Sequence, residues 1–257
     1  MNRFAIGHVL IKSRQLKQAV DHFEKLGFTV TYRTDTAKAH NALIYFRDGS
    51  FLELFNPKPI RLPDGLIRTV FRLLRPLHPA MVTRFLYYLE HEEGLNDFAL
   101  DSLQPEQAHA NVESVVQAGA KLGKTIHKSK TLPDGRKQSW WMAVPMEPRL
   151  PFLMSAYDPE IPCSEQEVTH TNGSLGIERL VIDVPELEPW MERYKLIFTG
   201  TECTREGQQC VFALGKQHTI VLRQARQHRM AEIHLLTSSQ SKGQLQLQQE
   251  LSKIIMR

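Results

Sequence analysis

Apolar and polar positions along the first 57 residues follow two different periods. Residues 4–12 form an apolar run rich in branched side chains, which is typical of a buried strand. From Leu16 to Leu26, apolar residues fall at i, i+3, i+4, i+7 and i+10, which predicts one face of a helix. Further runs predict strands at 28–32, 40–46 and 50–55, with a hairpin turn at Asp48-Gly49. The predicted order is therefore βαβββ.

This order recurs downstream, with two interruptions. A second βαβββ pattern spans 96–157, with its second strand at 122–128, and a third spans 177–224, with its second strand at 196–204. A strand at 230–238 followed by a helix at 243–256 begins a fourth. Residues 58–94 predict an insertion of two helices, and residues 158–173 predict a linker. We therefore predict an α+β protein in which repeated units build two curved sheets. Residues 1–160 hold two units and the helical insertion, and residues 174–257 hold the third unit and a truncated βα unit.

Composition and charge narrow the class of protein. The chain has 257 residues, of which 42% are hydrophobic and 23% charged, and its net charge is only +4. Basic residues between 61 and 84 alternate with apolar ones, which favours a solvated helical face over a surface for nucleic acid or acidic lipid. No apolar run approaches the roughly 20 residues needed to span a membrane, and the first twelve residues lack the features of a signal peptide.

Cysteine usage points to a reducing compartment. The three cysteines, Cys163, Cys203 and Cys210, are few and odd in number, so we expect no disulfide framework. Cys203 and Cys210 could face each other across a hairpin, but two thiols alone make a poor zinc site. Together with the missing signal peptide, this predicts a cytoplasmic protein.

The candidate chemistry lies in the first unit. His8 stands on the first strand and Glu53 on the last, so both can project from one sheet face. A neutral imidazole and a carboxylate suit a divalent ion such as Zn, Fe, Mn or Ni. The alternatives are a buried strand histidine bonded to a carbonyl group for His8, and an outward-facing residue on an edge strand for Glu53. An unpaired carboxylate among the apolar neighbours of Glu53 would be costly to bury.

Several segments in their order resemble the vicinal oxygen chelate superfamily, and within it the glyoxalase-like domain proteins. They are residues 6–11, 26–30, 40–44, 48–54, 150–153 and 170–173. The resemblance implies paired βαβββ units forming half-open barrels around a divalent metal, with ligands from the first and last strands of the units. His8 and Glu53 match two ligand positions, and Asp97 is the candidate third ligand. Met154 or Ser155 stands where a second Glu is expected, so a full His/Glu/His/Glu set is absent.

The resemblance also implies a function. We expect a metal-dependent lyase, isomerase or dioxygenase that acts on a small oxygenated molecule, with Glu53 as metal ligand or proton-transfer base. His40 and Asn41 are the candidate substrate contacts. The alternative is a non-catalytic protein of the same fold that sequesters a small molecule.

Expected partners follow from the same reasoning. The sequence predicts a small-molecule ligand, with neither nucleic acid nor membrane as a partner, and it is compatible with a homodimer. Glu178 and His234 are candidates for a second site in the last two units.

Overall fold

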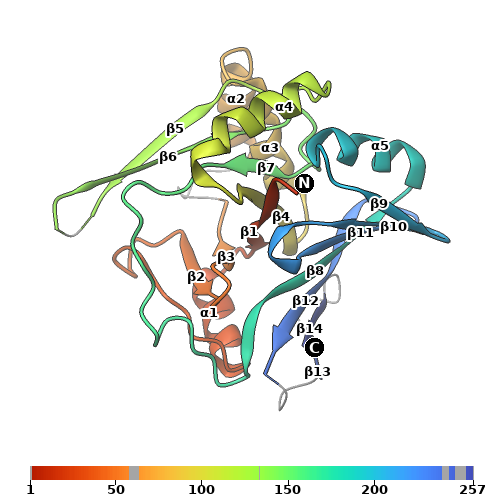
Figure 1. The fold of residues 1–257 in the computed structure, drawn as a ribbon. Helices are drawn as coiled ribbons and strands as arrows, with labels where there is room; N and C mark the ends of the chain where they lie inside the picture. The colour runs from red at the N-terminus through yellow and green to blue at the C-terminus, as the bar shows by residue number, and fades with distance from the viewer. Residues whose placement is uncertain (1, 58–63, 133, 239–242, 247–252, 257) are drawn as a thin grey trace.

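Two seven-stranded sheets dominate the structure, a computed structural model that describes residues 2–57, 64–132, 134–238, 243–246 and 253–256 (Figure 1). The first sheet has the order β2-β3-β1-β4-β7-β6-β5. Its strands are β1 (Phe4–Lys12), β2 (Asn41–Tyr45), β3 (Phe51–Phe55), β4 (Gly94–Ser102), β5 (Ile126–Thr131), β6 (Lys137–Ala143) and β7 (Phe152–Met154). Helices α1 (Leu16–Lys25) and α4 (Ala108–Gln117) follow β1 and β4, with a short 3-10 turn, η1 (Pro105–Gln107), before α4.

The second sheet repeats this arrangement, with the order β13-β14-β12-β8-β11-β10-β9. In both sheets two antiparallel central strands, β1 with β4 and β8 with β12, are each flanked by a parallel partner. The strands of the second sheet are β8 (Ser174–Val184), β9 (Cys203–Glu206), β10 (Gln209–Ala213), β11 (Thr219–Gln224), β12 (Arg229–Thr237), β13 (Gly243–Gln246) and β14 (Lys253–Met256). Helix α5 (Leu187–Ile197) follows β8, and the 3-10 turn η2 (Gly215–Gln217) precedes β11.

The predicted α+β fold of repeated units in curved sheets is confirmed, and the helical insertion appears as α2 (Asp64–Leu74) and α3 (Pro79–Glu90). Three local predictions were wrong. The strand expected at 28–32 is reduced to one bridge between Thr31 and Leu43. The predicted strands at 122–128 and 196–204 are shifted toward the C-terminus, to β5 and β9. Short segments carry too little periodicity to fix such boundaries.

The closing helix predicted over 243–256 is also wrong in the part that the structure describes. Residues 243–246 and 253–256 form strands β13 and β14, and residues 247–252 lie outside the described part. β14 pairs parallel with β12, and β13 pairs antiparallel with β14, as β3 and β2 do beside β1. The apolar spacing of this short segment predicted a helix, but pairing with β12 makes the segment a strand. Tertiary contacts commonly override such weak local signals.

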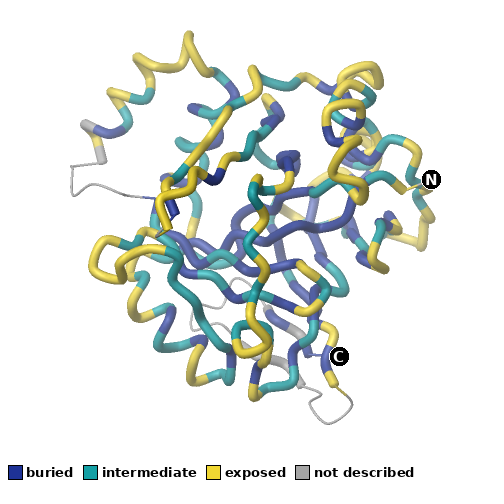
Figure 2. Tube along the Cα trace, turned by 60° about the vertical axis from the view of Figure 1, so that its left-hand side comes forward, coloured by how far each residue is buried: buried dark blue, intermediate teal, exposed yellow. Residues whose placement is uncertain are grey.

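Two apolar clusters occupy opposite faces of the first sheet. The larger contains Ile6, Val9 and Ile11 of β1, and it joins both sheets to α1, α4 and α5. The smaller lies on the other face, where Leu10 and Phe55 pack against Ala80 and Tyr88 of α3. Figure 2 shows the resulting pattern, with buried strands at the centre and exposed surfaces on the helices. The insertion therefore covers part of the free face of the first sheet.

A histidine holds the two sheets together. The register of β1 against β4 shifts between Ile6 and His8, so Gly7 is the extra residue of a β-bulge. The Ile6 amide donates to Nδ1 of His218 (3.0 Å), and Nε2 of that ring lies 3.2 Å from Oδ2 of Asp48. Because Nδ1 accepts a hydrogen bond, Nε2 carries the hydrogen and donates it to Asp48. The His218 imidazole of the second sheet thus forms hydrogen bonds both to β1 and to the β2–β3 hairpin of the first sheet.

The two thiols of the β9–β10 hairpin also meet. The structure joins Cys203 and Cys210 in a disulfide, whereas the sequence predicted only that they could face each other. Cys163 is a free thiol.

We expect His218→Ala to lower the free energy of unfolding by about 1–3 kcal/mol for each buried polar group that loses its partner. The group concerned is the Ile6 amide, because the Asp48 carboxylate keeps its hydrogen bonds from Ser50 and from the Ile177 amide. Urea unfolding followed by circular dichroism measures the loss, and His127→Ala, at an exposed position on β5, is the matched control. Equal stability of the two variants would contradict a bridging role for His218.

Candidate functional site

Three of the predicted site residues lie together on one face of the first sheet. β1 and β3 run parallel, with His8 opposite Phe51 and Leu10 opposite Glu53. Residues two apart on a strand share a face, so the imidazole and the carboxylate project to the same side. The His8 Nε2 lies 3.8 Å from the Glu53 Oε2, and the Asn41 side-chain amide donates to the Glu53 Oε1 (2.8 Å). Strands β1, β2 and β3 each contribute one member.

His8 is enclosed by aromatic rings. It is only 3% exposed, its ring stacks on Phe51 with centroids 4.5 Å apart, and Phe152 lies edge-on at 5.6 Å. Burial lowers the pKa of His8 to about 3, so the imidazole is neutral at neutral pH. The ring therefore carries no charge to form an ion pair with Glu53. Its Nδ1 is buried without a hydrogen-bond partner in the described part of the chain.

Glu53 is a carboxylate in a mostly apolar setting. Its side chain is 21% exposed. Burial raises the pKa of Glu53, and the hydrogen bond from Asn41 acts in the opposite direction. A carboxyl group with a raised pKa that remains accessible is suited to proton transfer near neutral pH.

Asp97 and His40 are used differently. The Asp97 carboxylate is buried and accepts hydrogen bonds from the Arg84 guanidinium, the Tyr88 hydroxyl and the Phe98 amide. Arg84 also donates to the Leu150 carbonyl oxygen (2.6 Å). Asp97 therefore fastens α3 to the sheet, and we leave it out of the proposed ligand set. The His40 side chain is exposed, and the residue directly precedes β2.

The donors present do not fit a resident divalent metal. His8 and Glu53 supply two donors, whereas resident zinc sites in proteins have three or four protein ligands. Within the described ranges, no three His, Cys, Asp or Glu side chains are grouped closely enough to hold an ion. This includes the suggested second site, where Nε2 of His234 lies 3.0 Å from Oε2 of Glu232 on its own strand.

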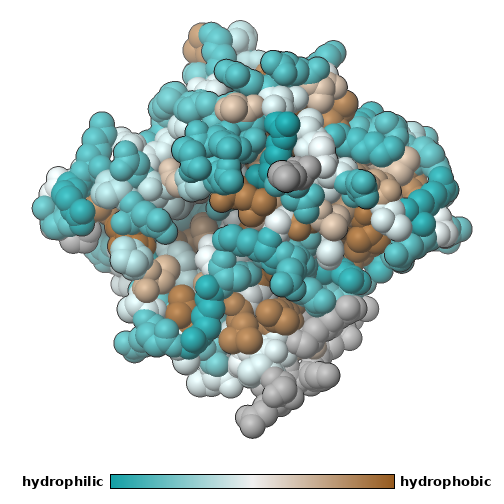
Figure 3. Space-filling model, in the orientation of Figure 1, coloured by the Kyte–Doolittle hydropathy of each residue, from teal (hydrophilic) through white to brown (hydrophobic). Residues whose placement is uncertain are grey.

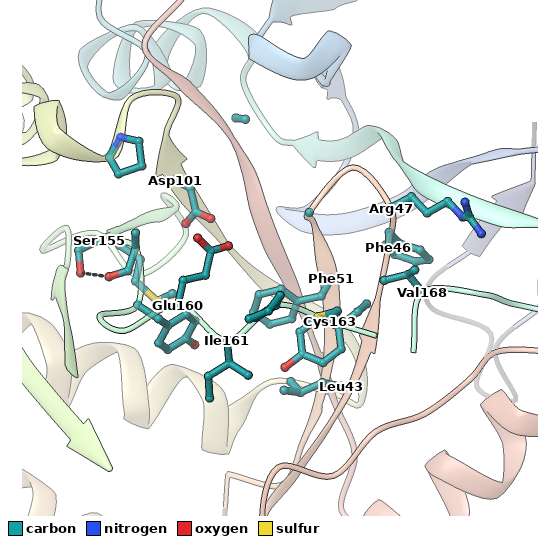
Figure 4. A pocket seen from close by; sticks show the side chains of 18 of the residues that line it. Leu43, Phe46, Arg47, Phe51, Asp101, Ser155, Glu160, Ile161, Cys163 and Val168 are labelled. Atoms are coloured by element: carbon teal, nitrogen blue, oxygen red, sulfur yellow. Dashed lines mark hydrogen bonds between the residues drawn. The ribbon is translucent and has the colours of Figure 1, made fainter. Parts of the chain in front are cut away.

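A cavity of about 710 Å³ opens beside this cluster (Figure 4). Leu43, Tyr45 and Phe51 line it from β2 and β3, and Asp101 lines it from the end of β4. Phe51 is shared, because the ring that lines the cavity also stacks on His8. The His8–Glu53 pair thus lies next to the cavity, behind the Phe51 ring.

The predicted linker forms the outer wall of the cavity, between 155 and 168. It is tied to the first sheet at both ends. The Gln138 side-chain amide donates to the Pro159 carbonyl (2.8 Å), and Nε2 of His170 lies 2.9 Å from the Tyr45 carbonyl oxygen of β2. Between them, the Arg33 guanidinium pairs with Glu167 at 3.0 Å. The sequence indicated a linker but gave no sign that it would close a cavity.

Asp101 is a cavity residue that the sequence reasoning missed. Its Oδ1 is buried and has no hydrogen-bond partner among the described residues. Burial raises the pKa of Asp101 to about 7, and the charge of Lys216 acts in the opposite direction. The available signal was Gly7, since a glycine inside a strand marks a bulge or a close approach.

The comparisons with known proteins agree with this architecture. A family model described as a glyoxalase-like domain matches residues 6–198. The chain belongs to the glyoxalase-like domain family. This glyoxalase-like protein is therefore a member of the vicinal oxygen chelate superfamily, as the sequence predicted. A search of curated proteins finds no match.

Solved structures share the fold at low sequence identity. A hypothetical protein from Staphylococcus aureus is similar over 99% of both chains, with a TM-score of 0.72 and 12% identity. A Mn(II)-bound glyoxalase from Novosphingobium aromaticivorans is similar over 94% of this chain and 68% of that chain (TM-score 0.53, 12% identity). 2,2',3-trihydroxybiphenyl 1,2-dioxygenase from Sphingomonas wittichii strain RW1 is similar over 93% of this chain and 75% of that chain (TM-score 0.51, 13% identity). At such identities the likeness concerns the fold alone.

The surface of the glyoxalase-like protein adds little to the choice of partner. Figure 3 shows a mostly hydrophilic face, on which apolar side chains form small separate groups. In the part of the chain that the structure describes, no helix combines the length and apolar character needed to cross a membrane.

We expect Asp97→Asn to lower the free energy of unfolding by about 3–5 kcal/mol, because it leaves the buried Arg84 guanidinium without its counter-charge. Chemical denaturation measures this loss. Asp134→Asn, which removes an exposed partner of Arg136, is the control and should change stability little. An Asp97→Asn variant as stable as the wild type would mean that the carboxylate is free for another role.

Proposed function

We propose that the chain is an enzyme that transfers a proton on a small oxygen-bearing molecule held in the cavity of the first sheet. The observation that carries this proposal is the position of the Glu53 carboxylate, oriented by Asn41 and 3.8 Å from a neutral His8 beside that cavity. The family membership and the small-molecule enzymes among its structural neighbours are consistent with a ligand of this size.

In the proposed step, Glu53 takes a proton from a carbon atom next to a carbonyl group of the substrate. The electron pair of the broken C–H bond moves into the substrate, which becomes an enolate, and Glu53 becomes a carboxylic acid. Return of the proton to the same or the adjacent carbon completes an exchange or an isomerisation. A neutral imidazole keeps one N–H donor, and His8 can offer it to the enolate oxygen.

The proposal involves no metal, because no three His, Cys, Asp or Glu side chains gather around Glu53 in the described part of the chain. The sequence resemblance implied a metal-bound substrate, and the Mn(II)-bound neighbour shows that this fold can hold such an ion. In this chain the corresponding face offers His8 and Glu53, while Asp97 is engaged by Arg84. In the proposed reaction, the side chains themselves supply the chemistry.

We expect Glu53→Gln to slow carbon-bound proton exchange by about 10²–10⁴-fold, the usual contribution of a positioned acid–base group. The measurement is exchange into D₂O, followed by proton NMR, for a panel of small hydroxyketones and 2-oxoacids. Wild-type exchange should rise with pH through a midpoint above that of an ordinary glutamate, because the active form is the carboxylate and burial raises its pKa. Glu206→Gln, at an exposed position on β9, is the matched control.

Two outcomes would overturn the catalytic proposal. One is equal exchange by the wild type and Glu53→Gln. The other is binding of panel compounds by the wild type with no exchange of any of them, which would support the sequestering protein of the same fold.

We expect the purified protein to contain well under one divalent metal ion per chain, because two donors hold such an ion weakly. Elemental analysis of the protein, before and after dialysis against a chelator, measures this. A stoichiometric metal that disappears in both His8→Ala and Glu53→Ala would contradict the expectation and restore metal-dependent chemistry.

A further inference from the structure

The Asp101 carboxyl group lines the cavity, and the proposed function does not use it. It lies at the end of β4, and its Oδ1 is buried with no hydrogen-bond partner in the described part of the chain. An unsatisfied buried acceptor costs stability, so its retention calls for an explanation. A ligand that donates a hydrogen bond would provide one.

The fold makes room for this carboxyl group. A Cβ atom built on Gly7 would lie under 3.0 Å from the Asp101 carboxyl carbon and both of its oxygens. Gly7 is also the extra residue of the β1 bulge, next to His8. The bulge that orients one member of the candidate site thus provides the space that Asp101 occupies.

Among the described residues, four basic ones line the cavity, Arg33, Arg47, Lys130 and Lys216, and none of them forms an ion pair with Asp101. Arg33 pairs with Glu167, Arg47 pairs with Glu165, and Lys216 donates to the Asp48 carbonyl oxygen (2.8 Å). The two arginines are therefore engaged by glutamates. Lys216 keeps its charge, which lowers the pKa of Asp101 without a direct contact, and burial lowers the pKa of Lys130. In Figure 4 the Glu160 side chain points toward Asp101, which brings a second acidic group to the same side of the cavity.

We propose that Asp101 binds the protonated nitrogen of an amine-bearing ligand. This inference deepens the proposed function and rests on it. It places a cationic group of the ligand in the same cavity, on the other side of Phe51 from Glu53. An ammonium group supplies both a hydrogen-bond donor and a counter-charge, whereas a hydroxyl group supplies only the donor.

The remaining walls suit an organic amine. Tyr45, Phe51 and Tyr157 present aromatic rings to the cavity. Aromatic faces attract organic cations and cover their apolar parts. A ligand with an amine at one end and an oxygen-bearing carbon skeleton at the other would contact Asp101 and reach toward Glu53.

The test uses benzylamine and the neutral benzyl alcohol as probes at pH 8, where Asp101 is mainly ionised. Binding to the wild type, Asp101→Asn and Gly7→Ala is measured by NMR titration of the folded proteins. Benzylamine should bind the wild type about tenfold or more tightly than Asp101→Asn, the range expected of one charge-assisted hydrogen bond. Benzyl alcohol should bind the two proteins within about twofold, and Asp134→Asn should behave as the wild type.

Gly7→Ala keeps the carboxylate but fills its space, so it should also reduce the preference for benzylamine. Equal benzylamine binding by the wild type and Asp101→Asn would overturn the proposal. So would an equal loss of both probes in Asp101→Asn, because that result would make Asp101 an acceptor for a neutral donor.

A measurement without ligand provides a second check. The native pKa of Asp101 is raised to about 7, so the native state holds the proton more tightly than the unfolded state does. This contribution to stability is present at acidic pH and is lost as the pH rises toward 7. Asp101→Asn should therefore melt at a higher temperature than the wild type at pH 8. The charged or titratable groups facing Asp101 are Lys216 of η2, and Tyr157 and Glu160 of the segment after β7.

A lower melting temperature for Asp101→Asn at pH 8 would mean that the carboxylate stabilises the fold, and would overturn a ligand-binding role. The outcomes are separable from those of the proposed function. Loss of amine selectivity alone, with Glu53-dependent exchange retained, overturns only this inference. Loss of exchange alone leaves the amine site in place.

Discussion

The extra residue in β1 sets the geometry around which both sheets meet. Gly7 bulges from the ladder with β4, and the neighbouring Ile6 amide donates to His218 of the second sheet instead. His218 in turn contacts Asp48 at the β2–β3 hairpin. One irregularity in a central strand therefore fixes the position of the second sheet against the first through directional hydrogen bonds in a buried region, where unpaired polar groups are costly.

The same irregularity shapes the free face of the first sheet. The bulge places His8 beside Glu53, and the missing side chain at Gly7 admits the Asp101 carboxyl group. A bulge next to a site is a common device, because it redirects one side chain without ending the strand. The face carries two acidic groups, Glu53 and Asp101. Asp101 lines the cavity, and Glu53 lies beside the cavity, behind the Phe51 ring.

Two segments outside the repeated units complete this face. The insertion covers one part, where the buried Arg84–Asp97 pair anchors α3, and the linker walls the other. Both segments lie against the first sheet, so two sheets of the same order acquire different faces. The family fold thus positions the site, and the insertion and the linker give the site its particular walls.

The sequence by itself determined the repeat, the helical insertion and the placement of His8, Asn41 and Glu53 on adjoining strands. Strand alternation and repeated order are local properties, and they need no knowledge of the partner strands. Only the tertiary structure decided that Asp97 pairs with Arg84, that Asp101 lies in a cavity with its Oδ1 unpaired among the described residues, and that 253–256 is a strand. Each of these depends on contacts between residues far apart in the chain or on a neighbouring strand's need for hydrogen bonds, and no local pattern encodes either.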